Sequence, residues 1–280
     1  MQYQPPCVNM WAKKIKENNT MTTLENLGRL EINTSKSFIY TISFAFKVIR
    51  QMFHPRTYNS AMRMVLVNQI YFTSVQILPA FLITSAVMGS LLIGIVFELL
   101  KQLNLDAYLG NVLMGLIVTE LSPLFTVFFI TLRSSSAINA EMAVMKVDGE
   151  IKTLEIFRID VINYLLIPRI INGVVSLVLL SGLFAIVLMS SGIIFAGAIF
   201  GINIDAYSTI LLTSADFSDI IVSLIKCATF GFFITLIPIR AGLNASREYT
   251  SIPISVSNGM VNVFITIVII EVLSLAIKLF

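Results

Sequence analysis

From about residue 74 onward, long apolar stretches alternate with short polar ones. The clearest apolar stretches are 74–100, 109–132 and 170–204, and the last contains no charged residue. Two further stretches, 218–239 and 253–279, are apolar apart from isolated charges. Because about 20 apolar residues are enough to cross the hydrocarbon core of a bilayer, each stretch can span a membrane. The pattern predicts an all-α integral membrane protein with five transmembrane helices.

The third stretch is longer than a membrane requires. As a helix rising 1.5 Å per residue it would measure about 52 Å, against about 30 Å of hydrocarbon. We expect this helix to tilt, to extend beyond the membrane, or to break near Ser190, Ser191 and Gly192.

The part before the first clear span has a different pattern. Segments 36–53 and 58–72 mix aromatic and aliphatic residues with Lys and Arg, and predict amphipathic helices lying in the membrane interface. A short first span is the alternative for 36–53. Residues 1–35 are polar and mixed in charge, which predicts a poorly ordered cytoplasmic tail. The expected domains are the tail 1–35, the interfacial helices 36–72 and a transmembrane domain 73–280.

Charge supports the membrane class and sets an orientation. Only 12% of the residues are charged, about half the ~25% of a soluble domain. Nine of the 19 Lys and Arg precede residue 64 and five lie within 133–169, whereas the loop between the third and fourth spans carries acids only. Since basic loops stay in the cytoplasm, we expect a cytoplasmic N-terminus and a C-terminus on the far side. Basic residues beside spans also indicate lipid headgroups as partners rather than nucleic acid.

One continuous segment carries most of the recognisable motifs. It reads Glu120-Leu-Ser-Pro123, then Arg133-Ser-Ser-Ser-Ala-Ile-Asn-Ala-Glu141, then Met145-Lys-Val-Asp-Gly-Glu-Ile-Lys-Thr-Leu-Glu155, then Asp160 and Pro168-Arg169. In order and spacing the segment resembles the MlaE/YrbE family of ABC-transporter permeases, which move phospholipids or other lipids in the Mla and Mce systems. The resemblance is dense over 119–173 and extends over 55–280. It implies structural roles for Pro123, Arg133, Glu141, Pro168 and Arg169.

The segment departs from the family pattern at three positions. Leu132 and Ser122 stand where the family has glycine, and Val161 stands where it has proline. These changes leave charge and size roughly intact, so they concern local backbone geometry more than the role of the segment.

The stretch 144–160 predicts a short amphipathic helix between two spans. Apolar residues recur at helical spacing at Val147, Ile151, Leu154 and then Phe157 or Ile159. The resemblance implies that this element is the coupling helix that docks on an ATPase. The expected contact residues are Asp148, Glu150, Ile151, Leu154, Glu155 and Asp160, with Lys152 and Arg158 beside them. A solvated helix without a partner is the alternative.

No chemistry of an enzyme is evident in the chain. Gly89 and Gly94 have the glycine spacing of a phosphate-binding loop, but Ile95 and Val96 follow where Lys and Ser or Thr are needed. The single His54 and the distant pair Cys7 and Cys227 form no catalytic set or metal site. We therefore expect no bound cofactor and no metal, with ATP bound by a partner subunit.

Three ionisable residues lie inside predicted spans, where they are costly and usually functional. Counting from the far ends of their helices at 1.5 Å per residue places Glu120, Lys226 and Glu271 about 12–16 Å deep, in one layer. Either they pair to hold spans together, with Lys226 neutralising Glu271 or Glu120, or they face a cavity and touch a lipid headgroup. Arg133 is expected to pair with Glu141 or Glu120.

The resulting hypothesis is a permease subunit of an ATP-driven lipid transporter in a bacterial inner membrane or a related organelle envelope. The resemblance implies a homodimer, a separate ABC ATPase subunit, an MCE-domain lipid-binding protein and membrane lipids as partners. The competing hypothesis is an ion- or proton-coupled secondary carrier that uses the three intramembrane charges. A structural anchor for a complex is a third possibility.

Overall fold

The structure, a computed structural model, describes residues 45, 46, 48–52, 60–105, 108–200 and 204–279. The chain divides into two units, Met1–Arg50 and Gln51–Phe280. The tail predicted over 1–35 and most of the interfacial helix predicted over 36–53 lie outside the described residues. None of the described residues lies in a strand.

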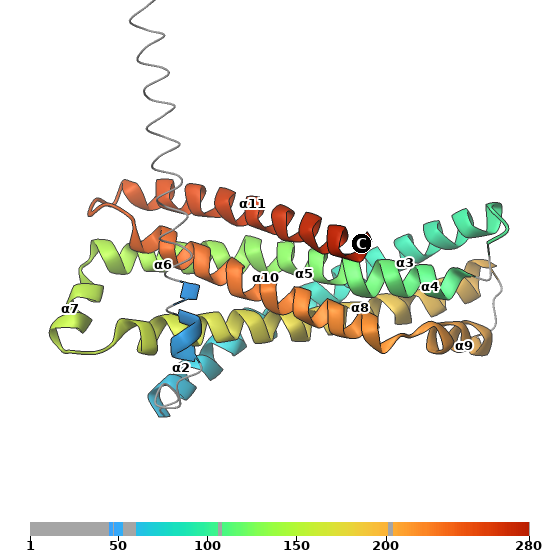
Figure 1. Cartoon of the computed structure of the whole chain (residues 1–280), viewed down its shortest axis with the longest axis horizontal. Coiled ribbons are helices and arrows are strands. Elements are labelled where there is room, and N and C mark those ends of the chain that lie inside the picture. Colours follow the sequence, from blue (N-terminus) through green and yellow to red (C-terminus); the bar gives the residue numbers. More distant parts are fainter. Residues whose placement is uncertain (1–44, 47, 53–59, 106–107, 201–203, 280) are drawn as a thin grey trace, which may run out of the picture. The chain divides into compact units, whose positions relative to one another are not determined.

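The second unit is a bundle of helices, several of which include π-helical turns (Figure 1). In chain order the elements of its first half are α2 (Ser60–Ile70), η2 (Tyr71–Val75), α3 (Leu78–Gln102), α4 (Leu109–Leu113), η4 (Met114–Leu121), α5 (Ser122–Ile130), η5 (Thr131–Ser135) and α6 (Ser136–Val147). Those of its second half are α7 (Glu150–Ile156), η6 (Ile162–Leu166), α8 (Ile167–Phe200), α9 (Ile204–Ser214), α10 (Phe217–Leu243) and α11 (Ser251–Leu279).

Among the described residues, five helical segments are long and apolar enough to cross a membrane, as the sequence predicts. They are Met62–Gln102, Leu109–Val147, Ile162–Ile193, Phe217–Leu243 and Ser251–Lys278. The short helix α7 lies at one end of this bundle and α9 at the other (Figure 1). We call these the α7 end and the α9 end. The segment predicted as the second interfacial helix is helical in α2 and leads through η2 into α3.

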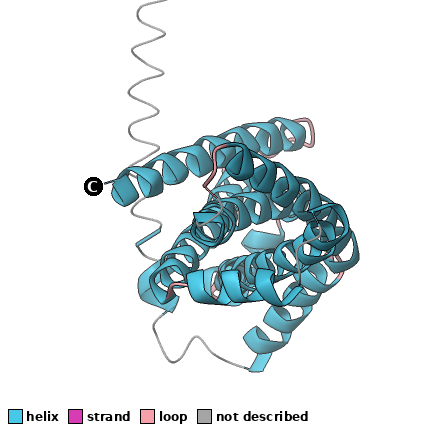
Figure 2. Ribbon diagram, turned by 90° about the vertical axis from the view of Figure 1, so that its right-hand side faces the viewer, coloured by secondary structure: helices cyan, strands magenta, loops and turns pink. Residues whose placement is uncertain are grey.

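Helix α8 is central and unbroken. It packs against α3, α5 and α10. Figure 2 shows the bundle turned by 90°, with its helices packed side by side. A Cβ on Gly192 would lie 2.1 Å from Ile93 Cδ1, and one on Gly89 would lie 2.8 Å from Leu188 Cα. The small residues near position 190 thus allow α3 to approach closely instead of breaking the helix, so of the three expected solutions the break is wrong.

The core is aromatic and aliphatic between these helices. Phe81 and Phe184 are fully buried, and Phe125 stacks on Phe184 with ring centroids 4.9 Å apart. Ser122 and Ser181 form a buried hydroxyl pair with their Oγ atoms 2.7 Å apart. Hydroxyls of this kind satisfy each other between helices where no water is available.

The predicted helix over 144–160 is wrong in its bounds. Helix α6 continues to Val147, Gly149 takes φ 78°, and α7 covers only Glu150–Ile156. Arg158 has φ 58° and ends the element. The helical spacing across 144–160 therefore belongs to two helices joined by a left-handed residue, a geometry that glycine adopts at little cost.

Candidate functional site: an intramembrane charge cluster and the α7 element

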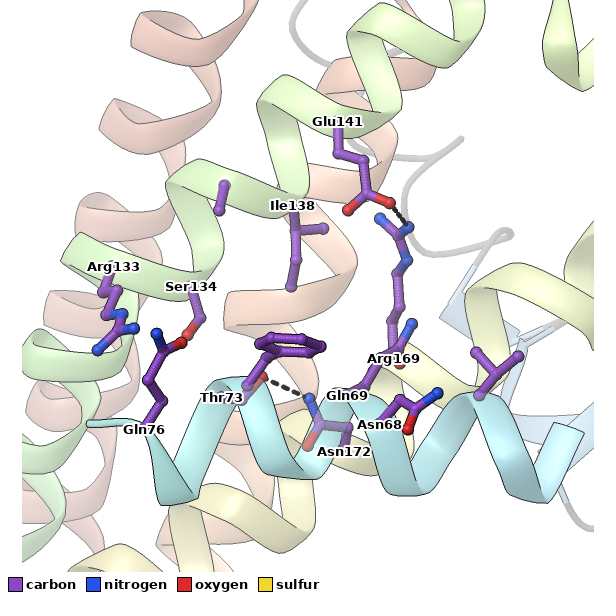
Figure 3. A pocket seen from close by; sticks show the side chains of 13 residues that line it. Asn68, Gln69, Thr73, Gln76, Arg133, Ser134, Ile138, Glu141, Arg169 and Asn172 are labelled. Carbon is purple, nitrogen blue, oxygen red and sulfur yellow. Dashed lines mark hydrogen bonds and ion pairs between the residues drawn. The ribbon is translucent and has the colours of Figure 1, made fainter. Parts of the chain in front are cut away.

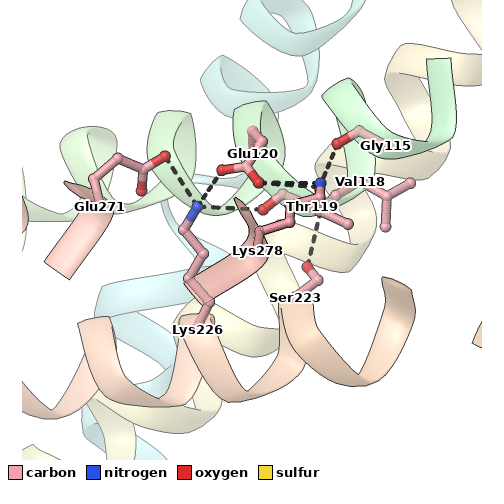
Figure 4. Close-up of polar contacts among 8 residues, drawn as sticks. All are labelled: Gly115, Val118, Thr119, Glu120, Ser223, Lys226, Glu271 and Lys278. Atoms are coloured by element: carbon pink, nitrogen blue, oxygen red, sulfur yellow. Dashed lines mark hydrogen bonds and ion pairs between the residues drawn. The ribbon is translucent and has the colours of Figure 1, made fainter. Parts of the chain in front are cut away.

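Four charged side chains meet near the α9 end of the bundle (Figure 4). The ammonium group of Lys226 lies 2.6 Å from Glu120 Oε2 and 2.9 Å from Glu271 Oε1. Lys278 Nζ lies 3.4 Å from the other oxygen of Glu120. We call these four residues the charge cluster. It joins η4, α10 and α11 and carries two positive and two negative charges.

The members of the charge cluster differ in exposure. The Lys226 side chain is 3% exposed, those of Glu120 and Glu271 are 16% and 15% exposed, and that of Lys278 is 44% exposed. Removing one member of a buried set leaves its partner charged in a low-dielectric surrounding, which is costly. Lys226 is therefore the centre of the cluster, and Lys278 is the member open to a ligand.

Pro123 explains why α10 is polar at this point. A proline has no N–H, so the carbonyl of Thr119 in an α-helical register, or of Val118 in a π-helical one, loses its donor. In the structure Ser223 Oγ donates to Val118 O at 2.9 Å, and Lys226 Nζ lies 3.4 Å from Thr119 O. The motif proline thus frees one carbonyl in η4, and α10 places a donor beside each of the two carbonyls that could lose theirs.

The same device recurs in α10. Pro238 lies inside the helix and leaves the carbonyl of Ile234 without its usual donor. Ser135 Oγ, fully buried, donates to Ile234 O at 2.7 Å. Ser135, the second serine after Arg133 in the motif segment, therefore holds η5 against α10.

The structure brings together the three intramembrane charges that depth counting placed in one layer. The expected pair of Lys226 with Glu271 is present, and so is the pair with Glu120. Sequence reasoning missed Lys278, although a signal for it exists. Lys278 follows Glu271 by seven residues, which is about two helical turns, so both lie on one helix face.

The α7 element protrudes from the opposite end of the bundle. Ile151 is buried and anchors it, whereas Ile156 and Phe157 are 69% and 72% exposed. Glu150 and Glu155 are exposed, and neither side chain is bonded to another described residue. The element therefore presents two large apolar side chains beside two unpaired acids.

The acids at either side of α7 have partners within the chain. Asp160 Oδ1 accepts the backbone N–H of Ile162 at 3.0 Å, so the side chain caps the start of the next helix. Asp148 accepts a hydrogen bond from Tyr249 Oη at 2.7 Å, which raises the pKa of Tyr249 above its usual value. The bond between Asp148 and Tyr249 ties the α6–α7 turn to the α10–α11 loop. Contact with an ATPase remains a prediction for Asp148, Glu150, Ile151, Leu154, Glu155 and Asp160.

The predicted pairing of Arg133 is wrong. Glu141 forms an ion pair with Arg169 at the start of α8, and Glu120 belongs to the charge cluster. Arg133 is exposed in η5 and lies on the other side of Ile138 from Glu141 (Figure 3). Arg133 and Glu141 are eight residues apart on a path that includes a π-helical turn, and such a turn changes the angle between their faces.

Known proteins are similar to this chain over most of its length. The family described as "Permease MlaE" matches residues 66–277. The "Probable ABC transporter permease protein" of Rickettsia felis is 23% identical over 244 residues, which are 87% of this chain and 93% of that protein. The "Intermembrane phospholipid transport system permease protein MlaE" of Haemophilus influenzae is 26% identical over 179 residues, covering 64% of this chain and 69% of that protein.

A plant protein is similar over a shorter region. "Protein TRIGALACTOSYLDIACYLGLYCEROL 1, chloroplastic" of Arabidopsis thaliana is 30% identical over 164 residues, which are 57% of this chain and 46% of that protein. The residues that match the family include α7, the motif prolines Pro123 and Pro168, and every member of the charge cluster except Lys278. With five helices able to span a membrane and a family match over most of its length, this multi-pass membrane chain belongs to the MlaE permease family.

Proposed function

We propose that this chain is the permease subunit of an ATP-driven phospholipid transporter. A separate ABC ATPase subunit binds and hydrolyses ATP, and the permease contributes no catalytic group of its own. The name of the Haemophilus influenzae relative supports a phospholipid substrate, and that of the Rickettsia felis relative supports an ABC-type partner. A bacterial inner membrane or the inner envelope of an organelle is the proposed location.

The α7 element is the observation that carries this proposal. A short helix with exposed Ile156 and Phe157 beside unpaired Glu150 and Glu155 fits a groove on a partner, with the apolar residues as anchors. Its movement would reach the spans through α6, because Gly242 of α10 and Gly259 of α11 both pack closely against it. A Cβ on Gly242 would lie 2.6 Å from Met142 Cβ, and one on Gly259 would lie 2.0 Å from Asn139 Nδ2.

Charge reversal tests the docking role of α7. Glu150→Lys with Glu155→Lys is expected to remove the ATP-binding subunit from the permease purified in mild detergent, and to abolish ATP-dependent lipid transfer between vesicles. Glu98→Lys, an exposed acid at the far end of α3, is the matched control and should leave both unchanged. The proposal fails if no ATP-binding subunit accompanies the native chain and the double variant transfers lipid normally.

The charge cluster supports two roles, which fall to different members. One role is to hold the spans together, and the other is to contact a lipid headgroup. Lys226 is buried between two acids and holds η4, α10 and α11 together. Lys278 is 44% exposed and lies where a lipid phosphate could reach a positive charge. The lipid path is proposed to pass beside Lys278. A second copy of the chain is proposed to complete this path, and an MCE-domain protein is proposed to receive or deliver the lipid.

The secondary carrier is the second candidate, favoured by the buried ionisable residues alone. A carrier should move its substrate in vesicles that contain only this chain and an ion gradient. Transport that requires the ATPase subunit and intact α7, and that persists without an ion gradient, excludes it.

A further inference from the structure

A cavity of about 500 Å³ lies at the α7 end of the bundle, between α2, η2, α6 and the start of α8 (Figure 3). Its volume is within the ~300–1,000 Å³ typical of small-ligand sites. No member of the charge cluster lines it. Its lining combines two arginines, one glutamate and several amides with an apolar wall, and none of these groups has a part in the function proposed above.

Arg169 is a buried donor with unused capacity. The residue is 4% exposed, and its Nη2 donates to Glu141. Its Nε and Nη1 atoms are also buried, and neither has a hydrogen-bond partner among the described residues. Leaving the N–H groups of a buried charged side chain unpaired is costly. A guanidinium presents its N–H groups in a planar fork that matches the oxygens of a phosphate, so an anion in the cavity would satisfy them.

Arg133 makes the cavity positive overall. It lines the end of the cavity near Gln76, whereas Arg169 and Glu141 lie on the other side of Ile138 (Figure 3). Arg133 makes no ion pair with another described residue. Two arginines against one glutamate leave a net charge of +1, which favours an anion over a cation.

The apolar wall between the two arginines favours an amphiphilic ligand. Phe72 is 63% exposed, and Val65 and Ile138 line the same cavity. Arg133 is 13 residues from Glu120 along one helical path, which is about 20 Å. If the charge cluster lies in the outer layer of the membrane, Arg133 is therefore near the opposite headgroup region.

We propose that this cavity binds a phosphate group presented by a phospholipid headgroup at the α7 end. The phosphate oxygens accept from Nε and Nη1 of Arg169, Arg133 adds attraction, and the glycerol portion lies on Phe72. The site is distinct from the charge cluster, and it does not depend on ATP-driven transport. A lipid held here would lie beside α6, which continues into the α7 turn.

Native mass spectrometry of the delipidated full-length protein in a phosphate-free detergent tests this site. The probes are dioleoyl phosphatidylglycerol, dioleoylglycerol with the same chains but no phosphate, and inorganic phosphate as a competitor. Phosphatidylglycerol is expected to bind, and Arg169→Lys and Arg133→Gln should each weaken binding about tenfold, the first through loss of a charge-assisted hydrogen bond and the second through loss of a positive charge. Arg169→Lys keeps the charge beside Glu141 but loses the fork. Arg247→Gln, which removes an exposed arginine outside the cavity, is the matched control and should bind as the native protein does.

If Arg169→Lys fails to fold, Arg133→Gln still tests the site, because Arg133 is exposed and its replacement should not disturb folding. Equal binding of dioleoylglycerol and phosphatidylglycerol would overturn the proposal, as would unchanged binding in Arg133→Gln. Displacement of the lipid by equimolar inorganic phosphate would identify a free-anion site and overturn the lipid assignment. Because no ATPase is present, failure here leaves the proposed transport function untouched, and loss of transport leaves this binding measurable.

Discussion

At the scale of single residues, Lys226 is 3% exposed and pairs with both Glu120 and Glu271, whereas Lys278 is 44% exposed and pairs with Glu120 alone. Lys226→Met leaves Glu271 without a cation and Glu120 with only the exposed Lys278, and should lower the free energy of unfolding by about 3–5 kcal/mol. Lys278→Met removes a 44% exposed charge and should cost about 1 kcal/mol or less. Thermal unfolding in detergent measures both, and adding Glu271→Gln to Lys226→Met should recover part of the loss. Equal losses for the two lysines would contradict the proposed centre of the cluster.

Ser135 and Pro238 make a second residue-scale prediction. Ser135→Ala leaves the buried carbonyl of Ile234 without a donor and should destabilise the protein by about 1–2 kcal/mol. Adding Pro238→Ala restores an N–H in α10 and should rescue most of that loss. Ser136→Ala is the control, because its hydroxyl bonds Leu132 O within its own helix. A rescue that fails, measured by the same unfolding transition, would show that Ser135 acts by packing alone.

At the scale of elements, the α6–α7 turn depends on one backbone conformation. Gly149 has φ 78° and nothing lies within 4 Å of an added Cβ, so Gly149→Ala is strained through the backbone only. The left-handed conformation should cost about 1–2 kcal/mol and increase hydrogen exchange over 148–157, measured by mass spectrometry. Gly182 of α8 is equally open but helical, so Gly182→Ala should stabilise by about 0.5–1 kcal/mol. Unchanged exchange in Gly149→Ala would mean that the turn tolerates a side chain.

At the scale of the whole molecule, the basic residues predict that the α7 end faces the cytoplasm. Cysteine labelling with a membrane-impermeant maleimide tests this orientation in a Cys7→Ser background. The remaining Cys227 is 2% exposed and should not react with the maleimide. A membrane-impermeant maleimide added to spheroplasts should label Ala215→Cys, near the α9 end, and should label Lys152→Cys in α7 only after permeabilisation. The reverse pattern would invert the topology and place α7 out of reach of a cytoplasmic ATPase.

The sequence by itself determined the class, the five spans, the expected orientation and the common depth of Glu120, Lys226 and Glu271. Apolar length and loop charge act locally along the chain, and a residue count along a helix measures depth without a partner. The sequence did not determine which faces meet. Lys278 joined the cluster, Glu141 paired with Arg169 instead of Arg133, and the helix expected over 144–160 divided at Gly149. Helix rotation and the π-helical turns at η4 and η5 decide these contacts, because each such turn shifts the face of every residue that follows it.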